Sequence, residues 1–337
     1  MKSKYRNLFF AFGIVAVLVM LFTFDMDYRE LWENLKRAGI YLPMVLLLWL
    51  FVYLINTFSW YLIVRSGGKA GFSFLHLYKF TVTGFALNYV TPVGLMGGEP
   101  YRIMELTPYV GVERATSSVI LYVMMHIFSH FCFWLSSVLI YICLHPVGWG
   151  MGIVLGAITL FCFFLITLFV KGYRHGMVIA CMRLGSRLPL LKNKAIRFIE
   201  THRQQLEDID GQIAVLHKQK KRVFYGALFL EYTARIVSCL EVWLILNVLT
   251  TNVSFIDCAL IVAFSSLLAN LLFFLPMQLG GREGGFALAV GGLSLSGAFG
   301  VYAALITRVR EIVWIMIGLA LMKIGNRKGL ARKEKSE

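Results

Sequence analysis

Charged residues are scarce in this chain. They make up 15% of its 337 residues, whereas hydrophobic residues make up 58%. Several apolar runs therefore exceed the roughly 18–20 residues that an α-helix needs to cross a bilayer. The net charge of +15 does not indicate a nucleic-acid partner, because the basic residues mainly flank apolar runs, as positive-inside topology requires. The composition predicts an all-α integral membrane protein.

The motifs of disulfide frameworks, metal sites and nucleotide sites are also missing. The six cysteines include no Cys-x-x-Cys pair, and most lie in apolar runs where free thiols behave as small hydrophobes. His126 and His130 are four residues apart, but no Glu separates them as in His-Glu-x-x-His, which favours packing or proton handling over zinc. The glycine-rich stretch Gly280–Gly285 lacks the Lys-Ser/Thr of a nucleotide loop. We therefore expect no metal and no cofactor.

The apolar runs divide the chain into five segments. Residues 1–39 hold a first span, Leu8–Phe24, and an interfacial helix, and no Ala-x-Ala-like cleavage site follows that span, so it is expected to stay uncleaved. Residues 40–170 and 223–324 form two repeats, which a basic linker, 171–222, connects and a basic tail, 325–337, follows. The other five full spans are predicted at Ile40–Val64, Val119–Leu144, Met151–Val170, Val223–Leu249 and Tyr302–Met322.

Charge asymmetry predicts the orientation of these spans. The linker carries twelve Lys or Arg, the tail from Lys323 six and the N-terminus three, so all three belong in the cytoplasm. Counting spans from these anchors makes Leu75–Arg102 begin and finish on the cytoplasmic side, and Cys258–Gly300 begin and finish outside. About six full spans plus two oppositely oriented re-entrant helical hairpins are thus expected, in a bacterial-type cytoplasmic (inner) membrane with both termini in the cytoplasm.

Two short motifs mark the tips of these hairpins. Residues 88–102 and 270–286 combine prolines, glycines and charges at the end of apolar runs, and such backbone opens at membrane depth only where protein or water surrounds it. Pro92 and Pro276 are 184 positions apart, as are Glu99 and Glu283. Since positive-inside counting orients the copies oppositely, we interpret them as an inverted-topology repeat, which in transporters places a substrate site at mid-membrane. The structural residues of the motifs are Asn88, Pro92, Gly97, Gly98, Asn270, Pro276, Gly280 and Gly281.

These motifs resemble those of the flippase-like transmembrane family that includes the membrane half of bacterial lysylphosphatidylglycerol synthases. The resemblance rests on the ordered pair of motifs with Arg102 and on Tyr302–Arg308 running to Gly318. Bifunctional relatives fuse this region to a soluble aminoacyl-transferase domain, so the resemblance implies the lipid-translocating part without the lipid-modifying part. Where many relatives carry an acidic-Arg pair after the first motif, Ser118–Met125 offers only Tyr122.

Ionisable residues in the apolar regions are the candidates for function. An isolated charge at the bilayer centre costs roughly 2.5–3.5 kcal/mol on insertion scales, so these groups must pair or line water. Helical spacing predicts two intramembrane ion pairs, Glu231 with Arg235 and Arg308 with Glu311. Arginine can grip a phosphate bidentately, whereas a glutamate can hold a broken helix or exchange protons. The predicted substrate-binding residues are Glu99, Arg102, Arg282, Glu283 and Arg308.

Three functions follow from these residues. The favoured one is a lipid flippase that moves an anionic phospholipid or lipid-linked precursor through a groove between the two repeats. The alternatives are an intramembrane lipid-modifying enzyme with Glu99 or Glu283 as general base, which the missing nucleophile–base spacing disfavours, and a membrane scaffold for a synthase partner. The sequence leaves a homo-oligomer and a partner synthase open, and membrane lipids are the expected partners.

Overall fold

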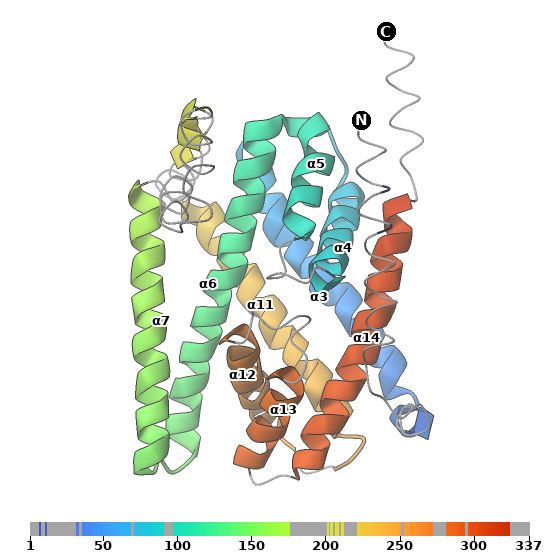
Figure 1. The fold of residues 1–337 in the computed structure, drawn as a ribbon, viewed down its shortest axis with the longest axis vertical. Coiled ribbons are helices and arrows are strands. Elements are labelled where there is room, and N and C mark those ends of the chain that lie inside the picture. Colours follow the sequence, from blue (N-terminus) through green and yellow to red (C-terminus); the bar gives the residue numbers. More distant parts are fainter. Residues whose placement is uncertain are drawn as a thin grey trace. The chain divides into compact units, whose positions relative to one another are not determined.

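The computed structural model describes residues 36–68, 71–90, 97–175, 221–250, 253–271, 281–293 and 296–323, with single residues at 7, 11, 32, 33, 201, 203–204, 206–208 and 210–211. Its helices are α3 (Tyr41–Ser66), α4 (Phe74–Val90), α5 (Gly98–Val110), α6 (Val112–Leu144), α7 (Trp149–His175), α11 (Lys221–Leu246), α12 (Phe255–Leu271), α13 (Gly281–Gly292) and α14 (Gly297–Lys323) (Figure 1). The described residues form no strand, which confirms the all-α prediction for them. The predicted span Leu8–Phe24, the tail 325–337 and most of the linker 171–222 lie outside the described residues.

Three of the described helices are long and apolar enough to cross a membrane: α3, α6 and the Trp149–Leu168 part of α7. The helices α11 and α14 are similarly long, with 26 and 27 residues, but they carry charges within their apolar sequence. Their role as full spans stays a prediction.

Helix lengths repeat along the chain. The series α3 to α6 has 26, 17, 13 and 33 residues, and the series α11 to α14 has 26, 17, 12 and 27. Lys221 follows Tyr41 by 180 positions, and Gly297 follows Val112 by 185, so the two series bracket the 184-residue offset between the two motifs. The inverted repeat itself stays a prediction, with which these helix lengths agree.

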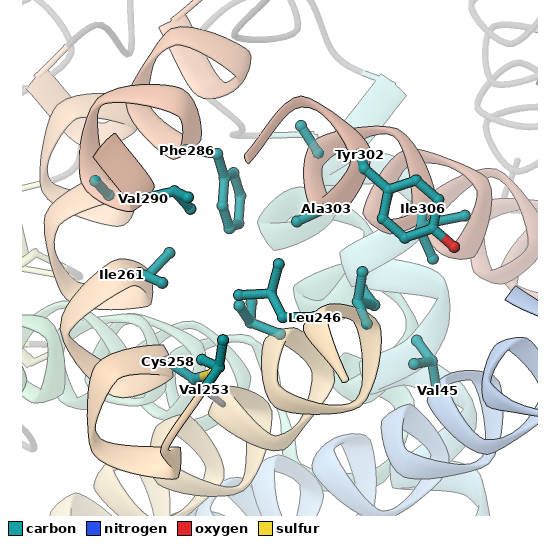
Figure 2. Packing of buried hydrophobic residues seen from close by; sticks show 14 of the residues in the cluster. Val45, Leu246, Val253, Cys258, Ile261, Phe286, Val290, Tyr302, Ala303 and Ile306 are labelled. Atoms are coloured by element: carbon teal, nitrogen blue, oxygen red, sulfur yellow. The ribbon is translucent and has the colours of Figure 1, made fainter. Parts of the chain in front are cut away.

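The chain divides into two compact units. Unit 1 comprises Met1–Leu54, Ser73–Arg102 and Ile236–Glu337, and unit 2 comprises Ile55–Phe72 and Ile103–Arg235. The core of unit 1 gathers apolar side chains from α3, α11, α12, α13 and α14 (Figure 2). Its labelled members in that view are Val45, Leu246, Val253, Cys258, Ile261, Phe286, Val290, Tyr302, Ala303 and Ile306.

Within unit 1, α14 (red) packs on α4 (cyan) and on α13 (Figure 1). The contact with α4 is close, because a Cβ added to Gly318 would lie 2.5 Å from the Cβ of Ala86 and 3.1 Å from the carbonyl oxygen of Val82. The Thr83 hydroxyl donates to the Gly318 carbonyl at 3.2 Å. Gly300 sits against the backbone of Phe286 in the same way. Small residues therefore allow the two short helices to approach α14 backbone to backbone, as glycines do in helix pairs within membranes.

In unit 2, α6 begins earlier than predicted, at Val112 rather than Val119, although Glu113 and Arg114 fall in its first turn. The Arg114 guanidinium donates to the carbonyl oxygens of Val64 and Gly68, both at 2.6 Å, and so satisfies the end of α3. These hydrogen bonds allow α6 to begin with a charged turn. The break before α6 lies at Gly111, whose φ of +84° suits glycine, whereas α5 continues through Pro108.

Candidate functional site

The first hairpin consists of α4 and α5. Gly98, at the start of α5, lies against the backbone of Gly84, and Arg102, one turn later, reaches the carbonyl oxygen of Thr81 at 3.3 Å. Later residues of α5 therefore contact earlier residues of α4, so the facing parts of the two helices are antiparallel. Any Cβ on Gly98 would collide with the Gly84 carbonyl, which explains why glycine occupies this position. Pro92 lies outside the described residues.

Asn88 joins the two helices of this hairpin. Its Oδ1 accepts the backbone N–H of Gly98 at 2.6 Å, and its Nδ2 donates to Glu99 Oε1 at 2.9 Å. The asparagine at the end of α4 thus caps the start of α5 and holds the carboxylate in its first turn, where the helix dipole favours negative charge.

The carboxylate of Glu99 also meets the guanidinium of Arg102. The Nη1–Oε1 distance is 3.4 Å, and 21% of the Glu99 side chain is exposed against 1% of the Arg102 side chain. The guanidinium lies over the Phe85 ring, 4.7 Å from its centroid. The pair combines a buried cation with a partly exposed anion, and the distance is longer than the 2.7–2.9 Å usual for charge-assisted hydrogen bonds.

The second hairpin, α12 and α13, repeats this close approach. A Cβ on Gly285 would lie 3.4 Å from the Cα and the carbonyl oxygen of Ser265. Arg282 and Glu283 fall in the first turn of α13, as Glu99 does in α5, but their side chains lie outside the description. Pro276 and Gly280 also lie outside the described residues. Asn270 donates to the Ser266 carbonyl of its own helix at 2.8 Å.

A buried ion pair connects α11 and α14 inside unit 1. Arg310 donates to both carboxylate oxygens of Glu241, at 2.9 and 3.1 Å, and their side chains are 1% and 5% exposed. Trp49 of α3 donates to the same carboxylate at 2.8 Å, and the Arg310 guanidinium lies 3.8 Å from the centroid of its ring. This bidentate, aromatic-covered pair has the geometry of a structural cross-link.

Arg308 and Glu311, predicted from spacing, lie within reach of each other in α14. Their Nη1–Oε2 distance is 3.5 Å, and the side chains are 5% and 1% exposed. Glu311 also approaches Arg310 at 3.8 Å. Two arginines and two glutamates therefore share the buried middle of unit 1, where their charges balance, as charges inside a membrane must.

Glu231 and Arg235, for which helical spacing predicts a pair, both have partners on α6. Glu231 Oε2 lies 2.8 Å from His126 Nδ1. Arg235 donates to the Ser129 hydroxyl and to the His126 carbonyl. The physical reason is that α6 packs against this face of α11 and supplies acceptors that a lone helix lacks. Among the described residues, no group of three or more His, Cys, Asp or Glu side chains could hold a metal ion.

The family model for the lysylphosphatidylglycerol synthase TM region matches residues 8–319. The chain belongs to this family. Comparisons with curated proteins and with solved structures find no match.

Membership in the lysylphosphatidylglycerol synthase TM family confirms the resemblance seen in the two motifs. Together with the three apolar helices of spanning length, it makes the chain a membrane protein. The matched residues include α4, α5, α12 and α13 and the ion-paired arginines of α14.

Sequence reasoning missed the pairing of Arg310 with Glu241. The two residues are 69 positions apart, so no helical spacing connects them. The available signal was that both are charged residues inside apolar sequence, and every such residue requires a partner. Of the predicted substrate-binding residues, Glu99, Arg102 and Arg308 are described with their side chains, and all three lie in unit 1.

Proposed function

We propose that this chain is a lipid flippase that moves an anionic phospholipid or lipid-linked precursor across a cytoplasmic-type membrane. In this proposal two re-entrant hairpins, α4–α5 and α12–α13, enter the membrane from opposite faces, both termini are cytoplasmic, and the halves 40–170 and 223–324 are inverted repeats. Broken helices that meet near mid-membrane are the usual frame of a transporter site. Family membership supports a function connected with membrane lipids.

One observation carries the choice of residues: the distances between the buried arginines of unit 1 and their glutamates are unequal. Arg310 binds Glu241 bidentately at 2.9 and 3.1 Å, whereas Arg102 and Arg308 meet their glutamates at 3.4 and 3.5 Å. A carboxylate that holds a guanidinium loosely is readily exchanged for a phosphate oxygen, which forms the same charge-assisted bond. Arg102 and Arg308 therefore bind the headgroup, and Arg310 holds the fold.

The remaining residues complete this site. Glu99, partly exposed and held by Asn88, takes Arg102 back when the headgroup leaves. Arg282 and Glu283, in the first turn of α13, are the candidate residues of the second hairpin. Neutral overall charge in the empty site avoids the cost of an unpaired buried cation.

The test is lipid movement by the purified full-length chain in liposomes. Vesicles contain fluorescent phosphatidylglycerol, phosphatidylcholine or polyprenyl phosphate in the inner leaflet, and a membrane-impermeant quencher detects each probe as it reaches the outside. We expect the anionic probes to move faster than in protein-free vesicles and faster than phosphatidylcholine. An unchanged rate for every probe contradicts the proposal. Lipids that change mass during the incubation contradict it too, because they identify an enzyme.

A matched control variant is available on the surface. Arg203 and Glu207 form an ion pair of 2.9 Å whose side chains are 74% and 45% exposed. Arg203→Gln removes a guanidinium of the same chemistry from a place outside the proposed site. The variant should move lipid at the wild-type rate.

A further inference from the structure

Unit 2 contains a second polar cluster, whose residues are not among those of the proposed lipid site. His126 of α6 and Glu231 of the first half of α11 are 2.8 Å apart between Nδ1 and Oε2. The Glu231 side chain is fully buried, whereas 32% of the His126 side chain is exposed. His126 lies about 21 Å along α6 from Val112, at a rise of 1.5 Å per residue, which is deep within a span. The partly exposed imidazole of His126 thus lies between the buried carboxylate of Glu231 and the surface of α6.

Arg235 of α11 carries the charge that balances the charge of Glu231. Its guanidinium donates to Ser129 Oγ at 2.7 Å and to the His126 carbonyl at 2.8 Å, on the same face of α6. Among the described residues, Glu231 Oε1 accepts no hydrogen bond. With a neutral imidazole, the cluster of one carboxylate and one guanidinium is electrically balanced.

The described groups whose rings or hydroxyls lie near the pair are uncharged when the imidazoles are neutral. On α6, the rings of Tyr122 and His130 lie 6.4 and 5.6 Å from the ring of His126, and the ring of Trp134 lies 5.4 Å from that of His130, tilted by 38°. On α11, the Tyr232 hydroxyl donates to Ser136 at 3.0 Å.

Two further helices border this cluster. From α3, Trp60 stacks on Tyr122, while Tyr61 and Arg65 are engaged with each other at the helix end. From α7, the Trp149–Val170 stretch brings no His and no charged residue, and its titratable side chain is Cys162. Among the described residues, Glu231 and Arg235 are the charged groups with a contact to His126 given above.

We propose that His126 and Glu231 form a proton-binding site. A carboxylate only accepts hydrogen bonds, so the neutral ring holds its hydrogen on Nδ1 and keeps the lone pair of Nε2. One proton taken up at Nε2 produces an imidazolium paired with Glu231, and the net charge of the cluster rises from zero to +1. The same proton leaves from Nε2 to restore the neutral pair. No other bond forms or breaks.

Proton binding changes the contact between α6 and α11. The hydrogen bond from the neutral ring to the carboxylate becomes an ion pair in which both partners are charged. The two helices are thus held together more firmly when the proton is bound. If the proposed lipid movement is correct, this site supplies its coupling to a proton gradient, and that link alone rests on the proposed function.

The experiment is a titration of the histidine side chains by nitrogen NMR, on the full-length chain in nanodiscs after treatment with a chelator. His126→Asn identifies the His126 signal and keeps a donor to Glu231, because the Asn amide nitrogen replaces Nδ1. We expect the His126 signal to pass from the neutral to the charged form between about pH 5 and 8. In Glu231→Gln the change should move toward lower pH by about one unit, because the imidazolium loses its counter-charge.

Three results overturn the proposal: a His126 ring that stays neutral throughout this range, a transition that Glu231→Gln leaves in place, and a signal that responds to zinc but not to pH. The titration needs no lipid movement. A chain that binds the proton but moves no lipid contradicts the proposed function and leaves the proton site standing. A chain that moves lipid without titrating His126 does the reverse.

Discussion

Replacing Arg310 with Met is expected to leave little folded protein, whereas replacing both Arg310 and Glu241 with Met is expected to restore it. The single change leaves the Glu241 carboxylate buried without its bidentate partner, at a cost of about 3–5 kcal/mol. The double change removes both charges and puts apolar side chains of similar length in their place, which is close to neutral in stability. The measurement is the melting temperature of the detergent-purified chain and its monodisperse fraction in size-exclusion chromatography.

The exposed pair of Arg203 and Glu207 provides the control for this cycle. It has the same 2.9 Å distance, but solvent surrounds it. Arg203→Met should leave the melting temperature unchanged, because exposed ion pairs add little stability. Equal losses in Arg310→Met and in the double variant would show that Arg310 contributes by packing on Trp49 rather than by charge.

Arg102→Lys is expected to slow the movement of anionic lipid by about tenfold or more, the effect of losing one charge-assisted hydrogen bond, while the chain stays folded. Lysine keeps the charge opposite Glu99 but not the planar fork that holds phosphate bidentately. The liposome assay with the anionic probe measures the initial rate, and phosphatidylcholine measures selectivity.

A structural role for Arg102 predicts a different outcome. The melting temperature would then fall, and the rates for anionic and zwitterionic probes would fall together. Arg203→Lys is the matched control and should change neither rate. Loss of the preference for the anionic probe at an unchanged melting temperature is the result that assigns Arg102 to the headgroup.

The sequence predicted the helical architecture well because it depends on local patterns. Apolar runs placed α3, α4, α6, α7, α11 and α14. The repeat that the spacing of the two motifs predicts stays a prediction. Helix ends were less accurate. The first turn of α6 was not predicted because Glu113 and Arg114 make it polar. The carbonyl oxygens that Arg114 binds belong to the end of α3, and no local pattern shows this contact.

The pairing of charges was only partly predictable. Arg102 with Glu99 and Arg308 with Glu311 follow from a spacing of three residues on one helix. Arg310 with Glu241 and His126 with Glu231 join different helices, 69 and 105 positions apart, and therefore depend on tertiary packing. The unequal lengths of the ion pairs, on which the proposed site rests, have no counterpart in the sequence.

The central claim, two hairpins that enter the membrane from opposite faces, is tested most directly by labelling single cysteines in oriented vesicles. The six native cysteines are replaced, and one new cysteine at a time is introduced at the end of a hairpin that lies farthest from its tip. The four variants are Ser73→Cys, Glu113→Cys, Ser254→Cys and Ser296→Cys. An impermeant maleimide should reach Ser73→Cys and Glu113→Cys from the cytoplasmic side, and Ser254→Cys and Ser296→Cys from the outer side. Labelling of Ser73→Cys and Glu113→Cys from opposite sides, or of all four from one side, would contradict the account.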